Sequence, residues 1–249
     1  MIESAVTISV TPRPRHALIS MAGTLDSWTY REVRDSVIKA ALDHHDAVVV
    51  DVSKLTVGAI TAWAAFTSAR WHVSAWPDVP VILVCDDEVE RARIRRSGIA
   101  RFVPVVADEA AAVGALGDHH RTRRRARRVL AASPESVGAA RRFAAECLTA
   151  WSRQDAVLTA SAVITVLVEN VLTHTRSHPV VTVETVEDLV TVAVSDDDPR
   201  AAVRHEAATN SAHTVSGLAV VAALTRSWGC IPAAGGKTVW ALIGPENRL

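Results

Sequence analysis

Hydrophobic and polar positions follow two alternating patterns in the first half of the chain. Short apolar runs bounded by turn residues predict strands, and apolar residues that recur every three or four positions predict helices. The expected strands lie at residues 6–10, 17–21, 47–52, 79–85 and 103–106, and the expected helices at residues 28–42, 61–74, 87–97 and 108–116. Because strands and helices alternate, we expect an α/β unit with a largely parallel sheet and helices packed on it.

The second half has a different order of elements. Helices are expected at residues 133–151, 158–175 and 218–228, paired strands at 180–186 and 189–194, and an edge strand after a glycine turn at 235–236. Along the second of these helices, steps of three and four residues place Asn170 and His174 on the same face as apolar residues. Polar groups therefore continue an apolar stripe on this helix.

Length and composition favour two domains joined by a basic segment. The chain has 249 residues, 49% of them hydrophobic, which is enough for two ordinary cores. Its formal net charge is zero, but residues 119–128 contain six arginines and no acidic residue. We therefore expect a domain at 1–118, an arginine-rich linker at 119–129 and a domain at 130–249. Clustered arginines can also bind nucleic acid, but no aromatic residues are interleaved with them, so a solvated linker is the favoured interpretation.

The cysteines and the apolar runs argue against export and membrane insertion. Cys85, Cys147 and Cys230 lie far apart in apolar stretches, a pattern typical of small buried hydrophobes and not of a disulfide set or a metal site. No apolar run approaches the roughly 18 residues of a spanning helix, and the first residues lack the order of an export signal. We expect a cytoplasmic protein with no membrane partner.

Three short motifs in the first half point to a known family. Gly23-Thr24-Leu25-Asp26 and Asp51-Val52-Ser53 each follow an expected strand, and Gly98-Ile99 precedes the last one. Together they resemble a STAS domain of the type found in anti-sigma-factor antagonists. The resemblance implies a sheet with helices packed on it, and a switch that works by phosphorylation of a Ser or Thr after the second motif.

The phosphoacceptor position of this switch corresponds to Thr61. The family has Asp-Ser-Ser-Gly here, whereas this chain has Ala59-Ile60-Thr61-Ala62, so only Thr61 retains a hydroxyl at the acceptor position. A phosphate at a helix N-terminus would be favoured locally, and its charge would disrupt an apolar partner surface. The alternative is that Thr61 only caps its helix and is never modified.

The second half resembles a bacterial anti-sigma-factor serine kinase domain, which has the GHKL-type ATPase α/β sandwich. The resemblance rests on four motifs in order: Asn170, Asp196-Asp197-Asp198-Pro199, Ser216-Gly217-Leu218 and Gly235-Gly236-Lys237-Thr238-Val239-Trp240. It implies that the domain binds ATP with Mg²⁺ under a lid at residues 200–215. In that case Asn170 holds the metal, and His174, four residues later, is a further nucleotide-binding residue. Gly217 opens a helix whose backbone amides can cradle phosphate, Asp196 accepts a hydrogen bond from the adenine amino group, and Thr238 helps to fix the nucleotide.

One position departs from the kinase family in a way that affects catalysis. The family has a Glu four residues before the Asn, and this chain has Val166, which cannot accept a proton. Glu169 lies roughly 60 degrees further around the helix, too displaced to replace it. We therefore expect a weak or inactive kinase, and leave open whether the protein is an enzyme.

Together the two resemblances imply a regulator of partner switching that controls a bacterial sigma factor. Its expected partners are a sigma factor, an anti-sigma kinase or a STAS-domain protein, and contact between its own two halves, within one chain or in a homodimer, is also expected. The alternative is an active serine/threonine kinase that phosphorylates a STAS-domain protein, with its own Thr61 as a candidate target. Nucleic acid is not an expected partner.

Overall fold

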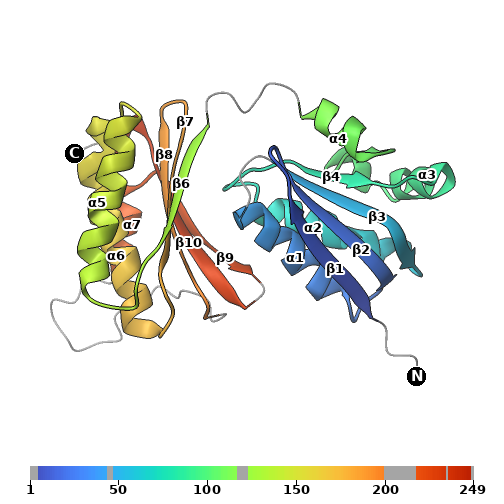
Figure 1. The fold of residues 1–249 in the computed structure, drawn as a ribbon, viewed down its shortest axis with the longest axis horizontal. Helices are drawn as coiled ribbons and strands as arrows, with labels where there is room; N and C mark the ends of the chain where they lie inside the picture. Colours follow the sequence, from blue (N-terminus) through green and yellow to red (C-terminus); the bar gives the residue numbers. More distant parts are fainter. Residues whose placement is uncertain (1–4, 44–46, 117–122, 199–216, 234, 248–249) are drawn as a thin grey trace. The chain divides into compact units, whose positions relative to one another are not determined.

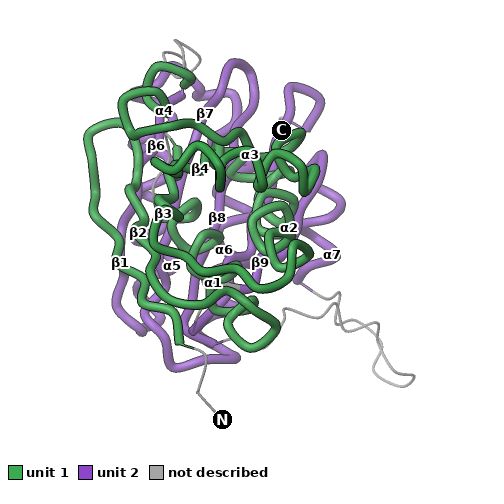
Figure 2. The backbone as a smooth tube through the Cα atoms, turned by 90° about the vertical axis from the view of Figure 1, so that its right-hand side faces the viewer, with its two compact units in different colours: residues 1–120 green, residues 121–249 purple. Residues whose placement is uncertain are grey.

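The chain folds into two compact units, residues 1–120 and residues 121–249 (Figure 2). The structure is a computed structural model, and it describes residues 5–43, 47–116, 123–198, 217–233 and 235–247. The lid expected at residues 200–215, together with Ser216 and Pro199, lies outside these ranges. Each unit has its own sheet and its own hydrophobic core, so each is described separately.

The N-terminal unit contains a five-stranded mixed sheet in the order β1-β2-β3-β4-β5 (Figure 1). The strands are β1 (Val6–Pro12), β2 (Ala17–Leu25), β3 (Val48–Val57), β4 (Val81–Val84) and β5 (Val105–Val106). β1 pairs antiparallel with β2, and the other neighbours are parallel. The expected α/β unit with a largely parallel sheet is therefore confirmed.

Helices connect the parallel strands of this unit, as the alternating pattern predicts. They are α1 (Tyr30–Asp43), the 3-10 turn η1 (Ile60–Trp63) with α2 (Ala64–His72), α3 (Glu88–Arg96) with the 3-10 turn η2 (Ile99–Arg101), and α4 (Glu109–Ala115). Two of them begin at aspartates that act as N-caps. The Asp87 carboxylate accepts a hydrogen bond from the Glu90 N–H at 2.8 Å, and the Asp108 carboxylate accepts one from the Ala111 N–H at 2.7 Å. Such caps satisfy donors that have no partner within the helix.

The C-terminal unit contains a five-stranded antiparallel sheet in the order β6-β7-β8-β10-β9. The strands are β6 (Arg124–Val129), β7 (Val180–Val186), β8 (Leu189–Asp196), β9 (Ser227–Ala233) and β10 (Gly236–Ile243). The helices are α5 (Glu135–Ala150), α6 (Val157–His174), α7 (Gly217–Leu224) and the short η3 (Gln154–Ala156) and η4 (Pro245–Asn247). Figure 1 shows α5, α6 and α7 along one face of this sheet, which makes the unit α+β.

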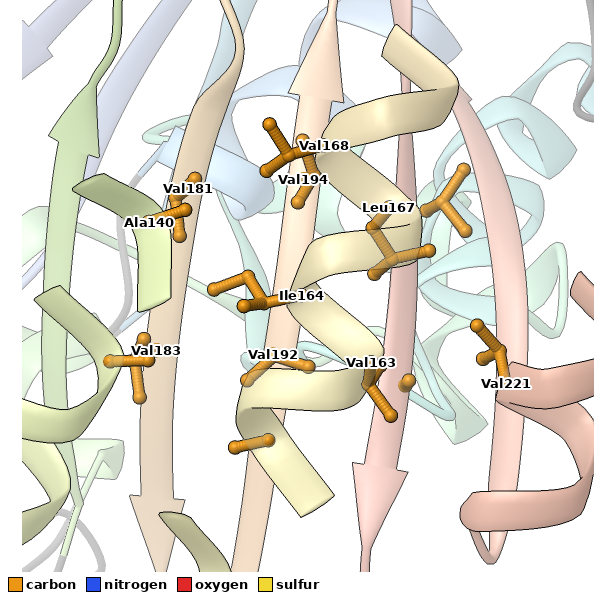
Figure 3. Close-up of a cluster of buried hydrophobic side chains, with 14 of the residues drawn as sticks. Ala140, Val163, Ile164, Leu167, Val168, Val181, Val183, Val192, Val194 and Val221 are labelled. Atoms are coloured by element: carbon orange, nitrogen blue, oxygen red, sulfur yellow. The ribbon is translucent and has the colours of Figure 1, made fainter. Parts of the chain in front are cut away.

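The core of the C-terminal unit lies between α6 and the sheet. Ile164 and Val168 of α6 lie over valines of β7 and β8 in Figure 3, and these side chains are buried, as is Leu167. By length and composition alone, Gln154–His174 would qualify as a membrane span, contrary to the expectation that no segment does so. Its apolar character is explained by its place in the core, because α6 packs against α5, α7 and the sheet, and a core helix passes the same test.

Three expectations about the second half were wrong. Residues 124–129, expected in a linker, form the edge strand β6, in which Ala126 packs toward the core while Arg128 lies 4.4 Å from the Phe143 ring. Charged side chains suit an edge strand because they discourage further strand pairing.

The other two errors concern the end of the chain. The helix expected at 218–228 ends at Leu224, and β9 begins at Ser227. β10 lies between β8 and β9, so it is not an edge strand.

Replacing Leu167 by Ala should reduce the free energy of unfolding by about 2–5 kcal/mol, because the removed side chain leaves a cavity in the core. Urea denaturation measures the change. The matched control is Leu158→Ala on the same helix, where Leu158 is 64% exposed. An equal loss in both variants would contradict the position of α6 in the core.

Candidate functional site

Thr61 lies on a short turn that connects β3 to α2. It is the second residue of η1, and its side chain is exposed. The residue at the N-cap of this turn is Ala59, whose side chain makes no capping hydrogen bond, and the Ala62 N–H donates to the Ala59 carbonyl at 2.9 Å. Thr61 is therefore not the capping residue, and its hydroxyl faces solvent without a hydrogen-bond partner among the described residues.

Buried residues on both sides of Thr61 hold this turn in place. Ala62 and Trp63 are buried, and the Trp63 ring lies 5.8 Å from the ring of Phe66. Ile60, by contrast, is 57% exposed. The arrangement presents a hydroxyl and an apolar side chain next to each other on an anchored turn, which is the geometry that a charge-based switch of an apolar contact requires.

In the C-terminal unit, Val166, Asn170 and Gly217 come together where α6 meets α7. A Cβ atom at Gly217 would lie 2.8 Å from Cγ1 of Val166 and 3.8 Å from Oδ1 of Asn170. The glycine is thus required by close packing against a stiff β-branched side chain. Asn170 is only half-buried, and Glu169 points to solvent. Residue 166 itself is a valine, so it supplies no carboxylate here.

Asp196 lies at the end of β8 and is held by Lys237 of β10. The two residues are register partners, and the Lys237 Nζ lies 3.0 Å from Oδ1 and 3.0 Å from Oδ2 of Asp196. The same ammonium donates to the Asp198 carbonyl at 3.1 Å, and the Asp198 N–H donates to Asp196 Oδ1 at 2.8 Å. Both side chains are at least nine-tenths buried. Sequence reasoning missed this pair, although the two motifs that supply it were recognised.

Thr238 lies on the other face of the sheet from Asp196. Its register partner is Ser195, and the two hydroxyl oxygens are 2.7 Å apart. The core residues Val194 and Val239 identify the helix-covered face, and alternation puts Asp196 and Lys237 on that face. The structure therefore does not bring Asp196 and Thr238 into one site.

His174 lines an open cleft of about 690 Å³ at the end of α6. The cleft also includes Arg176 and Ser177, and, after β8, Asp197 and Asp198. The Asp197 N–H donates to Ser177 Oγ at 3.0 Å, which joins the two loops. His174 is thus exposed in a polar cleft and not part of a buried stripe.

The residues expected to hold ATP do not fit it in this arrangement. The Asp196 carboxylate, which would accept from the adenine amino group, already accepts from Lys237 and from the Asp198 backbone. Thr238 lies on the opposite face, and Val166 supplies no base. ATP with Mg²⁺, and the role of Asn170 as its metal ligand, stay predictions from the sequence alone.

The cysteines do not add a nucleophile to either unit. None of the three, all of which lie in the described ranges, forms a disulfide. Burial raises the pKa of the Cys85 thiol and of the Cys147 thiol above the ordinary value. Both are therefore held further toward the unreactive thiol form.

Comparison with known proteins identifies the N-terminal unit. Residues 7–112 match the family model of the STAS domain. These residues form a STAS domain. The match covers less than half of the chain, and it leaves residues 113–249 unassigned. No curated protein matches the chain.

Several solved structures show a distant likeness to the chain. An anti-sigma factor antagonist from Mycobacterium paratuberculosis is 17% identical, with 46% of this chain and 96% of that chain covered and a TM-score of 0.39. The RsbU and RsbW domains of a Mycobacterium tuberculosis protein are 19% identical, with 49% and 32% covered and a TM-score of 0.37. The anti-sigma factor antagonist SpoIIAA in its unphosphorylated form is 14% identical, with 44% and 96% covered and a TM-score of 0.35.

Replacing Lys237 by Met should lower the free energy of unfolding by about 3–5 kcal/mol, because it leaves the buried Asp196 charge without its partner. The double variant Lys237→Met/Asp196→Asn should recover most of this loss. Chemical denaturation measures both, and Lys54→Met at an exposed position is the control for loss of a surface charge. A loss no larger than that of the control would contradict the buried ion pair.

Proposed function

We propose that this protein regulates a bacterial sigma factor by partner switching, and that its STAS domain is the partner-binding module. One observation carries the proposal: in the STAS domain, Thr61, which the sequence resemblance puts at the acceptor position, is exposed on a turn that its buried neighbours anchor. The partner is a sigma factor, an anti-sigma kinase or another STAS-domain protein. Because such partners work with the transcription machinery, the proposed location is the cytoplasm.

Phosphorylation of Thr61 is the proposed switch. A phosphate adds close to two negative charges at neutral pH, and here it would lie beside the exposed Ile60. A partner surface that buries Ile60 would then have to desolvate those charges, so the phosphorylated form should release the partner. The unmodified chain is the binding-competent form.

The C-terminal unit is proposed to be a kinase-like module that binds a protein and does not transfer phosphate. Val166 supports this assignment because a methyl group cannot activate the attacking hydroxyl. The active-kinase alternative lacks a specific observation in its favour. Since the two units share one chain, each is present at an effective concentration of about millimolar for the other, which favours contact within the chain or in a homodimer.

Thr61→Glu should weaken partner binding by at least about tenfold, because it places a permanent charge beside Ile60. Candidate sigma, anti-sigma and STAS proteins of the source organism are purified, and their Kd for the full chain is measured by calorimetry. Thr61→Ala should bind like the unmodified chain, and Thr7→Glu, at another exposed position of the same unit, is the charge control. If Thr61→Glu binds every partner as tightly as Thr61→Ala, the proposed switch is wrong.

Incubation of the purified full chain with radiolabelled ATP should transfer no phosphate to its own Thr61 or to a STAS-domain partner. The reason is that Val166 offers no proton acceptor. Thr61→Ala is the matched control for self-phosphorylation. Label that appears in the unmodified chain and disappears in Thr61→Ala would favour the kinase alternative.

A further inference from the structure

We propose that Lys237 permanently occupies the Asp196 carboxylate as an internal cation, so that the C-terminal unit works without adenine nucleotide. The proposal goes beyond partner switching, because it concerns which small ligand the second unit can take. It rests on the position of the ion pair at the helix-covered face of the sheet, where the resemblance to kinases places the adenine.

The Lys237 ammonium is surrounded by oxygen atoms at the end of β8 and in the loop that follows it. It donates hydrogen bonds to Oδ1 of Asp196 at 3.0 Å and to the carbonyl of Asp198 at 3.1 Å, and it forms an ion pair with Oδ2 of Asp196 at 3.0 Å. The charge of the ammonium is thus balanced by the Asp196 carboxylate. The same carboxylate also holds the first residues after β8, because it accepts a hydrogen bond from the Asp198 N–H.

The Asp196 carboxylate already has hydrogen-bond donors within the protein. A carboxylate recognises the amino group of adenine because it accepts hydrogen bonds without donating any. Here Oδ1 of Asp196 accepts from the ammonium and from a backbone N–H, and Oδ2 lies 3.0 Å from the ammonium as its ion-pair partner. An adenine amino group is neutral, and it would have to share the carboxylate with a charged donor that already neutralises it, so its hydrogen bond would be weaker than one to a free carboxylate.

The backbone around the pair leaves little room for a rearrangement. Gly236 approaches the end of β8 so closely that a Cβ at this position would meet the Asp196 carbonyl oxygen. Lys237 follows directly and is held in ladder register with Asp196 by the β8–β10 pairing. The side chain of Lys237 therefore starts opposite the carboxylate and reaches it without a change in the backbone.

The test is a calorimetric titration of the full chain with Mg·ATP and, as a comparison, Mg·GTP. The unmodified chain should show no binding at nucleotide concentrations up to about 10 mM. Lys237→Thr exposes the carboxylate and should tighten ATP binding by about tenfold or more, the usual contribution of a hydrogen bond to a charged group. Lys237→Thr/Asp196→Asn lacks the charged acceptor and should lose this gain. Circular dichroism checks that each variant is folded.

Each outcome of the titration supports or overturns the proposal. ATP binding by the unmodified chain that Asp196→Asn removes would overturn it, and so would a folded Lys237→Thr variant that gains no affinity. If Lys237→Thr does not fold, the titration of the unmodified chain with Mg·ATP alone tests the proposal: absence of binding supports it, and binding overturns it. The result is independent of the partner proposed for the STAS domain, since loss of that partner leaves these titrations unchanged.

Discussion

The two-residue period of the antiparallel pair β8 and β10 is the constraint that determines what the C-terminal unit can do. Val192 and Val194 of β8 face the helices, so Asp196 must face them too, and the β10 residue opposite it is Lys237. Thr238, one residue further, is forced to the other face, where it meets Ser195. A motif that contains both a lysine and a threonine thus presents only the lysine to Asp196.

This constraint explains why the sequence predicted the elements of the C-terminal unit better than its site. Helical and alternating periods identified α5, α6, β7 and β8, because each buries one face against the same core. The order of residues in a motif, however, does not say which face each side chain takes until the strand register is known. Asp196 and Lys237 lie 41 positions apart, and only the β8–β10 ladder makes them neighbours.

The errors at β6 and β9 have a common physical origin in edge strands. Both lie at the ends of the sheet order, where one side of the strand has no ladder partner within the sheet. An edge strand can carry many charges, and the four arginines of β6 made its sequence resemble a linker. Only two residues separate β9 from the apolar helix α7, and a Cβ at Gly229 in the centre of β9 would lie 2.8 Å from the Trp240 ring of β10, so a glycine is required there. In the N-terminal unit the parallel strand β4 and the first half of the parallel strand β3 are buried as continuous apolar runs, which is why sequence reasoning located these two.

The two units differ in the kind of chemistry that they leave available, and this difference bears on how such a regulator would receive its signal. In the C-terminal unit the polar groups nearest the expected nucleotide site satisfy one another, and Val166 replaces the expected base. In the STAS domain, Thr61 has a solvent-facing hydroxyl that no described group engages, next to an exposed apolar side chain. This distribution agrees with the proposed function, in which Thr61 is the group that is modified and the C-terminal unit binds without transferring phosphate. On the proposed function, the signal therefore enters at Thr61 from a separate kinase, and the C-terminal unit contributes binding that does not vary with the supply of ATP.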